Sequence, residues 1–352
     1  MINNPDGNLH VYMLSVGQAD TSIIVSPQGR VVVIDATRPT KLLNLLDDLG
    51  LDGNIEHLII THPHDDHFRG ANRLADERNI EEATVAPFWH DFGMGPPTYR
   101  ALIARLAGQQ TNTMFLSGYS RWYPDGALTQ PPAGVDPEID HDAPFLEILG
   151  PTNGLVRMLE DANVFNTNHL SIMTRLSWRH FRMINTGDAQ MENWSYFDTE
   201  RLMEDKCQVL RAAHHGSPNG TQWERITRLG PSQVIVSSDP HSGHHLPDLT
   251  ATAIFAKFDS TDGQMAALTV DTGTIHLRVT SGGNRKLTRF GDTPGQDVDL
   301  NAGVSLTESS NPTDWAALLP SPESLASSLG ILDTNAILSL PCSAIFASES
   351  TN

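Results

Sequence analysis

Cysteine and long apolar runs are scarce in this sequence. The 352 residues include two cysteines, Cys207 and Cys342, which are too few for a disulfide framework or a cysteine-ligated zinc ribbon. No apolar run approaches the roughly 20 residues that a membrane-spanning helix needs, and residues 1–6 lack the basic and apolar regions of a signal peptide. These absences predict a cytoplasmic protein that makes no membrane contact.

Basic residues are also scarce. The chain has 23 Lys and Arg against 42 Asp and Glu, which gives a formal net charge of −19, and no run rich in Lys or Arg occurs. A protein that binds long nucleic acid usually has a basic face, because neutralising phosphates supplies most of the affinity. The charge balance therefore disfavours a binder of long duplexes and favours a small or short substrate.

What the sequence does contain is a cluster of metal-type side chains, meaning side chains such as His and Asp that can bind metal ions, in residues 61–67. His62, His64, Asp66 and His67 follow a short apolar run and precede a stretch with helical character. Isolated histidines are mostly solvated, but three imidazoles and a carboxylate in one loop suit zinc and neighbouring metals. Because a loop turns alternate side chains to opposite sides, His62 and His64 are expected to hold one ion, and Asp66 and His67 another.

The pattern His62-x-His64-x-Asp66-His67 resembles the signature of the metallo-β-lactamase fold. Other stretches resemble the branch that contains the hydrolase domain of ComEC-type DNA-uptake proteins and the bacterial phosphorylcholine esterases. These stretches are residues 14–20, 185–188, 211–217 and 243–244. The resemblance covers roughly residues 9–282. It implies an α/β fold, the four-layer αβ/βα sandwich, in which strand-end loops of both halves bring the ligands to one edge.

The resemblance also implies a paired-metal site. Zinc is the predicted metal for both divalent ions, with manganese or iron as alternatives that His and Asp ligands allow. The residues that match ligands of the family are His62, His64, Asp66, His67, His169, Asp188 and His215. In the family, the aspartate that matches Asp188 bridges the two ions.

Two of these matches leave alternatives open. Many enzymes of this fold have a ligand at the place of His169, whereas the ComEC branch often has an Asn/Ser pattern there, and this chain has Asn168 and Ser171 beside the histidine. At the second place, His214 and His215 are adjacent at a strand exit, where neighbouring side chains cannot both point the same way. Related enzymes have Gly-His-Gly there, which makes His215 the expected ligand and His214 a candidate for contacting the substrate.

The expected catalytic residues are Asp66, His214 and His244. Asp66 would orient the attacking hydroxide while binding metal, and His214 or His244 would neutralise developing charge or protonate the leaving group, since imidazole titrates near neutrality. The family usually has proline directly after the histidine that matches His244, but His245 follows it here, which leaves its role open. Asp35 closes an apolar strand, where a carboxylate needs partners. In the family, the matching aspartate organises the loops beneath the metals and is not a ligand.

The function implied by the resemblance is hydrolysis of phosphodiester bonds by metal-activated hydroxide. The substrate would be a small molecule or a short nucleic acid, so a nuclease acting on ends or short strands and a small-molecule phosphodiesterase both remain open. Hydrolysis of a carboxylic ester, lactone or β-lactam is the alternative, and the His-His-Gly-Ser element at 214–217 argues against it. A non-catalytic binding protein is a third hypothesis, which the intact ligand set disfavours.

Three segments are expected in the domain organisation. Residues 1–282 form the metallo-β-lactamase-fold catalytic domain, and within it residues 87–144 form an insertion near the site. Aromatic residues in that insertion would line a substrate pocket or bury the segment against the core. Residues 283–352 are a polar, turn-rich C-terminal extension of unknown role.

Overall fold

The computed structural model of the chain describes part of its length. The described residues are 5–86, 97–115, 120–122, 124–125, 143–199, 206–239, 242–258, 267–269, 273–281, 285–290 and 297–299. Most of the predicted insertion at 87–144 and of the extension at 283–352 lies outside them, so the roles expected for both segments stay predictions. Among the described helices, none has the length and apolar character needed to cross a bilayer.

Nine strands form the first sheet, in the order β16-β15-β14-β1-β2-β3-β4-β5-β6. Their bounds are β1 Leu9–Met13, β2 Ser22–Val25, β3 Val31–Ile34, β4 Ile55–Ile60, β5 Ile80–Val85, β6 Asn112–Phe115, β14 Thr274–Val279, β15 Arg285–Phe290 and β16 Asp297–Asp299. Neighbours from β3 to β6 are parallel, and the other pairs are antiparallel. The sheet continues past residue 282, because β15 pairs with β14.

Seven strands form the second sheet, in the order β13-β12-β11-β10-β9-β8-β7. Their bounds are β7 Ser120–Trp122, β8 Phe145–Gly150, β9 Met173–Trp178, β10 Phe181–Asn185, β11 Val209–Arg211, β12 Gln233–Val236 and β13 Ala267–Leu268. The strands from β10 to β13 are parallel, and the pairs from β7 to β10 are antiparallel. Both sheets therefore combine a parallel with an antiparallel part.

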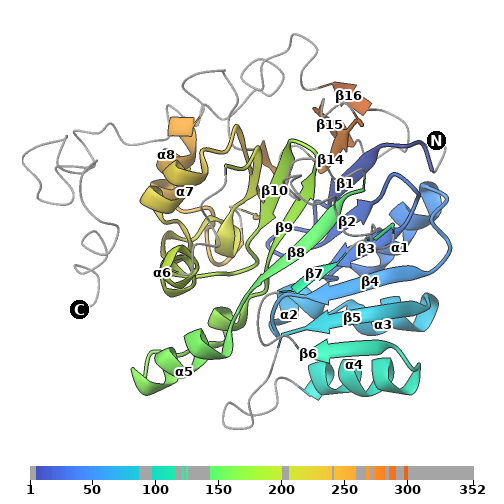
Figure 1. The fold of residues 1–352 in the computed structure, drawn as a ribbon, viewed down its shortest axis with the longest axis horizontal. Helices are drawn as coiled ribbons and strands as arrows, with labels where there is room; N and C mark the ends of the chain where they lie inside the picture. The colour runs from blue at the N-terminus through green and yellow to red at the C-terminus, as the bar shows by residue number, and fades with distance from the viewer. Residues whose placement is uncertain are drawn as a thin grey trace, which may run out of the picture.

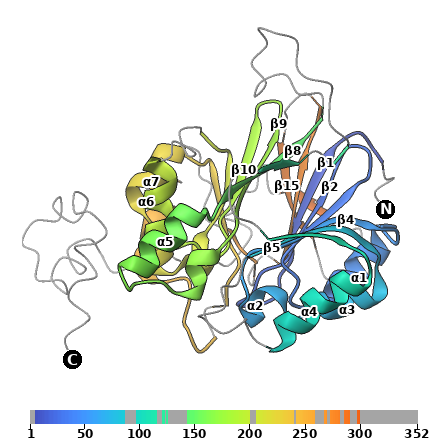
Figure 2. The ribbon, with the colours of Figure 1, turned by 60° about the horizontal axis from the view of Figure 1, so that its bottom comes forward.

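Helices cover the outer face of each sheet. Their bounds are α1 Pro39–Asp48, α2 Asp65–Phe68, α3 Ala71–Glu77, α4 Pro97–Gly108, α5 Asn153–Asp161, α6 Met191–Thr199, α7 Trp223–Leu229 and α8 Leu249–Phe258. In Figures 1 and 2, α1, α3 and α4 lie on one side of the pair of sheets, and α5, α6 and α7 lie on the other.

Three hydrophobic cores separate the four layers. Strand β3 contributes to two of these cores. Val31 and Val33 pack in the core beneath α1, α3 and α4, whereas Val32 and Ile34 pack between the two sheets. The third core lies between the second sheet and α6, α7 and α8. Successive side chains of a strand point to opposite faces, so strands buried on both faces read as continuous apolar runs. The predicted α/β sandwich is confirmed.

His57 is a buried polar residue on β4. Its Nε2 lies 2.7 Å from Thr84 Oγ1, and the edge of its ring meets Trp122 at a centroid distance of 4.8 Å. Burial lowers the pKa of His57 from 6.5 to about 4, so the native state holds this imidazole neutral over a pH range in which the unfolded chain binds a proton.

This difference predicts a loss of stability in acid. Between pH 6.5 and about 4 the unfolded state takes up the proton first, so the free energy of unfolding falls as pH falls, by about 2–3 kcal/mol from this group. Urea unfolding at pH 7 and pH 4.5 measures the change, and His57→Gln should show a smaller change than the wild type. An equal pH dependence in the two proteins would show that His57 is not its source.

Candidate metal centre

Strand-end loops from both halves of the fold bring the predicted ligands together. Asp35 follows β3, the cluster at 61–67 follows β4, Asp188 follows β10, and His214 and His215 follow β11. All four strands run in the parallel parts of their sheets. Carboxyl ends of parallel strands lie at the same edge of a sheet, which is where open α/β folds place their sites.

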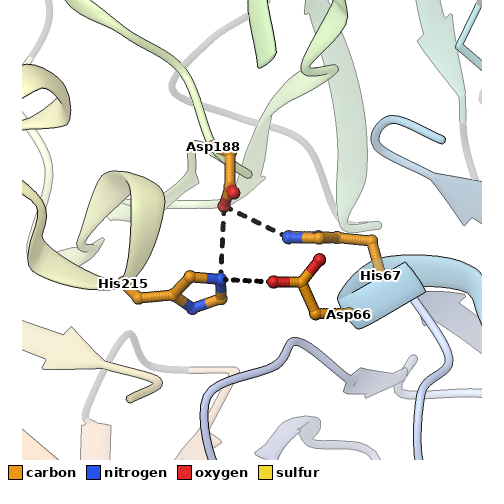
Figure 3. A group of neighbouring side chains, drawn as sticks. All are labelled: Asp66, His67, Asp188 and His215. Atoms are coloured by element: carbon orange, nitrogen blue, oxygen red, sulfur yellow. Dashed lines mark ion pairs between the residues drawn. The ribbon is translucent and has the colours of Figure 1, made fainter. Parts of the chain in front are cut away.

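The first group of metal-type side chains consists of Asp66, His67, Asp188 and His215 (Figure 3). One ligand atom from each lies within 4.8 Å of all the others. His67 Nε2 is 3.2 Å and His215 Nε2 is 3.6 Å from Asp188 Oδ1, and His215 Nε2 is 3.4 Å from Asp66 Oδ2. The two imidazoles and two carboxylates thus face one common point.

The second group shares Asp188 with the first and adds His62 and His64. His62 Nε2 lies 3.7 Å from Asp188 Oδ2 and 3.0 Å from His64 Nδ1. His214 Nε2 also lies 3.7 Å from Asp188 Oδ2. Each carboxylate oxygen of Asp188 therefore faces a different group. The predicted pairs His62 with His64 and Asp66 with His67 fall in different groups, but Asp66 and His67 are neighbours in helix α2, so alternation along a loop does not explain the division. That each pair holds an ion stays a prediction.

The first group fits a divalent cation. His67 Nε2, Asp188 Oδ1 and His215 Nε2 are buried and form no hydrogen bond of adequate geometry. Buried polar atoms are nearly always paired, so three unsatisfied atoms that face one another are suited to bind one common cation. Imidazole nitrogen with carboxylate oxygen is a donor set that zinc and related ions accept.

Partners on the far side of each ring present Nε2 to the centre. His67 Nδ1 donates to Asp35 Oδ2 at 2.7 Å, His215 Nδ1 donates to the Ser237 carbonyl at 2.7 Å, and His214 Nδ1 donates to Asn219 Oδ1 at 2.8 Å. Such contacts fix the tautomer and the ring orientation of metal-ligating histidines. With Nδ1 held in this way, Nε2 of each ring faces the centre of its group.

The electrostatics of the two groups differ. Burial lowers the pKa of His215, but Asp188 and Asp20 outweigh it and raise the pKa to about 9. Burial and the neighbouring His67 lower the pKa of His62, and burial lowers that of His64. The first group therefore attracts positive charge, whereas the imidazoles of the second are neutral, which is the form that binds metal.

Asp35 lies beneath the first group without reaching its centre. It is fully buried, and it accepts 2.8 Å hydrogen bonds from the Thr61 backbone N–H at Oδ1 and from the Thr61 hydroxyl at Oδ2. Together with the bond from His67 Nδ1, these contacts hold the start of the ligand loop. Asp35 thus contacts the ligand loop through Thr61 and His67, and its predicted role beneath the metals stays a prediction.

Asp20 and Arg211 form a buried ion pair that sequence reasoning did not assign. Asp20 lies in the β1–β2 loop and Arg211 ends β11, so the pair joins the two sheets, and Asp20 Oδ1 also lies 3.5 Å from His215 Nδ1. A metal-type group of Asp20, Asp35 and His67 exists here too, but Arg211 already compensates Asp20, and His67 Nδ1 donates to Asp35. The sequence did contain a signal for this pair, because Arg211 is a charged residue at the end of an apolar strand. A buried cation needs a carboxylate partner.

The adjacent histidines correct one expectation. His214 and His215 have φ angles of 49° and 54°, in the left-handed region, so the alternation of an extended strand does not apply to them. Both Nε2 atoms approach Asp188, at different oxygens. Gly216 follows with φ 78°, and a Cβ there would lie 2.6 Å from Pro247 Cβ, so this turn needs a glycine.

Two predicted site residues lie outside these groups. His169 Nδ1 accepts a 3.0 Å hydrogen bond from the Asn166 N–H, and its Nε2 lies 3.2 Å from Glu192 Oε2. His244 is exposed, and its backbone N–H lies 3.4 Å from Ser242 Oγ. Within the described part of the chain, neither residue joins a metal-type group, and the metal role of His169 and the catalytic role of His244 stay predictions.

Comparison with known proteins finds one family model that matches part of the chain. Residues 14–160 match the model of the Metallo-beta-lactamase superfamily, a stretch that includes the loop at 61–67. A UPF0173 metal-dependent hydrolase of Cupriavidus metallidurans is 34% identical over 86 residues, which is 24% of this chain. The match covers 27% of that relative, so this chain spans about a quarter of its length. The narrower resemblance to the ComEC branch stays a prediction.

Similar solved structures include two metalloproteins of low sequence identity. CmlA, a diiron β-hydroxylase from Streptomyces venezuelae, has a TM-score of 0.46 and 13% identity over 81% of this chain and 55% of its own. Igni18, a metallo hydrolase from the archaeon Ignicoccus hospitalis, has a TM-score of 0.39 and 13% identity over 80% of this chain and 100% of its own.

Proposed function

We propose that this chain, in which residues 14–160 match the metallo-β-lactamase superfamily, is a metal-dependent hydrolase with a two-ion centre that cleaves phosphodiester bonds. The observation that carries the proposal is the position of Asp188, whose two oxygens face two separate groups of metal-type side chains. One carboxylate placed in this way favours a pair of ions over a single ion. Zinc is the proposed metal, with manganese or iron as alternatives.

The residues of the two groups would hold the ions. Asp66, His67, Asp188 and His215 would bind one, and His62 and His64 would share Asp188 to bind the other. Bound divalent ions lower the pKa of water and stabilise negative charge on a phosphoryl oxygen.

Two half-exposed side chains are in a position to meet the substrate. Asp66 has 38% of its side chain exposed and His214 has 22%, whereas Asp188 and His215 are buried. The carboxylate of Asp66 would orient the attacking hydroxide while binding metal. His214 Nε2, with its Nδ1 held by Asn219, is the ring atom that would stabilise or protonate the leaving oxygen.

Phosphodiesters are proposed as the substrate class because residues 185–188 and 211–217 resemble a branch whose members hydrolyse them. The net charge of −19 supports small molecules or short nucleic acids over long duplexes. Carboxylic esters and lactones are the competing substrates.

The test is hydrolysis of bis-p-nitrophenyl phosphate by protein reconstituted with zinc, manganese or iron. We expect turnover that requires metal and is lost in Asp188→Ala. Labelled single- and double-stranded DNA, run alongside, distinguishes a nuclease from a small-molecule enzyme. Protein that carries its metals, cleaves esters or lactones and leaves every phosphodiester intact would overturn the proposed substrate class.

A further inference from the structure

A large cleft lies beside the candidate metal centre. It has a volume of about 1170 Å³ and is lined by the β1–β2 loop, by residues along the whole of α1 and by one side of α2. Asp66 lines this cleft and also belongs to the first metal-type group. Small-molecule sites typically occupy about 300–1,000 Å³, so the cleft has room for a substrate that extends well beyond the reacting bond.

Three cationic side chains line the cleft, namely Arg38, Lys41 and Arg69. Two of them are held at its wall by backbone carbonyls. Lys41 Nζ donates to the Ser15 carbonyl at 2.7 Å, and Arg38 Nε donates to the Val16 carbonyl at 3.4 Å. These bonds orient the cations without neutralising them.

Their charges are not compensated by direct contact. Within the ranges that the structure describes, neither Arg38, Lys41 nor Arg69 forms an ion pair with a carboxylate, although many other cations of this acidic chain do. Arg69 follows Asp66 by three residues across the short helix α2, a spacing that places two side chains on the same side of a helix. Uncompensated cations therefore extend from α1 towards the metal centre.

The cleft is not uniformly basic. Asp48 and Asp65 also line it, and Asn44, Thr40 and Ser15 add neutral polar groups. A long polyanion would meet these carboxylates and the net negative charge of the whole chain. A compact anionic group, by contrast, would contact Arg38 and Lys41, with which no carboxylate of the described residues forms an ion pair.

We propose that this cleft binds a second phosphate of the substrate, so that the preferred substrates are phosphodiesters carrying another phosphate, such as a 5′-phosphorylated dinucleotide. This inference rests on the proposed function, because the scissile phosphodiester would lie at Asp66 and the second phosphate at Arg38 and Lys41. A guanidinium binds phosphate with two parallel hydrogen bonds, and an ammonium acts as a point charge. Each such charged hydrogen bond changes affinity by roughly tenfold or more.

The test compares the binding of two nucleotides that contain no phosphodiester bond, measured by calorimetry on metal-loaded protein. Thymidine 3′,5′-bisphosphate should bind about tenfold more tightly than thymidine 5′-monophosphate. The double variant Arg38→Gln/Lys41→Gln should bring the two affinities close together. Arg30→Gln removes a cation that pairs with Glu56 outside the cleft, and it should keep the wild-type ratio. Thermal unfolding checks that both variants fold.

The outcomes separate this inference from the proposed function. Equal affinities for the two nucleotides in the wild type, or a ratio that the double variant leaves unchanged, would overturn the second-phosphate site. Hydrolysis of bis-p-nitrophenyl phosphate, which has no second phosphate, reports on the proposed function alone. Wild-type protein should also cleave the 5′-phosphorylated dinucleotide with a higher kcat/KM than the unphosphorylated one, and the double variant should reduce that ratio.

Discussion

Replacing Asp188 by asparagine is expected to lower kcat on bis-p-nitrophenyl phosphate on the order of a thousandfold. Asp188 is the one side chain that belongs to both metal-type groups within the described residues, and its oxygens lie 3.2 Å from His67 Nε2 and 3.7 Å from His62 Nε2. Asparagine would remove the negative charge shared by both ions and would place an amide NH₂ where one ion needs a lone pair. The initial rate with saturating metal measures the loss.

The fold should tolerate this change. The backbone N–H of residue 188 donates to Ser171 Oγ at 3.1 Å, a contact that does not involve the side chain. Asp161→Asn makes the same chemical change at the exposed end of α5 and serves as the matched control. If Asp188→Asn kept more than about a tenth of the wild-type rate, a shared carboxylate would not be required for the chemistry.

Replacing Asp35 should have the second largest effect, and two substitutions separate its causes. Asp35→Ala would remove the acceptor of the Thr61 N–H and of His67 Nδ1 inside a fully buried site, where breaking such a set costs about 3–5 kcal/mol of stability. It would also place alanine at φ 57°, a conformation that asparagine and aspartate tolerate better. Urea unfolding measures the loss.

Asp35→Asn should fold far better and still bind metal poorly. Its amide oxygen can accept from the Thr61 N–H, but its NH₂ would face His67 Nδ1, where Asp35 now accepts a hydrogen bond. His67 would then carry its proton on Nε2, the atom that faces Asp188 and the proposed ion. We expect zinc affinity to fall by about 10–100-fold in a chelator competition. Wild-type affinity in a folded Asp35→Asn protein would contradict this role.

Most of the centre was predictable from sequence because its residues follow apolar strands. Asp35 and the loop at 61–67 come directly after buried strands, Asp188 comes three residues after another, and the structure brings them to one edge between the sheets. The layered fold was predicted from the resemblance that these residues carry, and β3, an apolar run buried on both faces, agrees with it. Apolar runs and the polar residues that end them can be read directly from a sequence.

The remaining features depend on backbone conformation and on long-range packing, which the sequence does not show directly. The direction of His214 follows from two successive left-handed residues, and the pairing of Asp20 with Arg211 joins segments far apart in the chain. The cleft arises where α1 packs beside the β1–β2 loop, which turns the cations Arg38 and Lys41 towards a common space. Neither the spacing nor the type of these residues indicates that they meet.

The most direct measurement of a two-ion centre is a zinc titration of metal-free protein, with bound metal counted after equilibrium dialysis. We predict two zinc ions per wild-type chain and fewer than two for Asp188→Asn at the same free zinc concentration. His57→Gln, which removes an imidazole outside both groups, should still bind two. One ion or none in the wild type, or two ions bound with wild-type affinity by Asp188→Asn, would contradict the shared site.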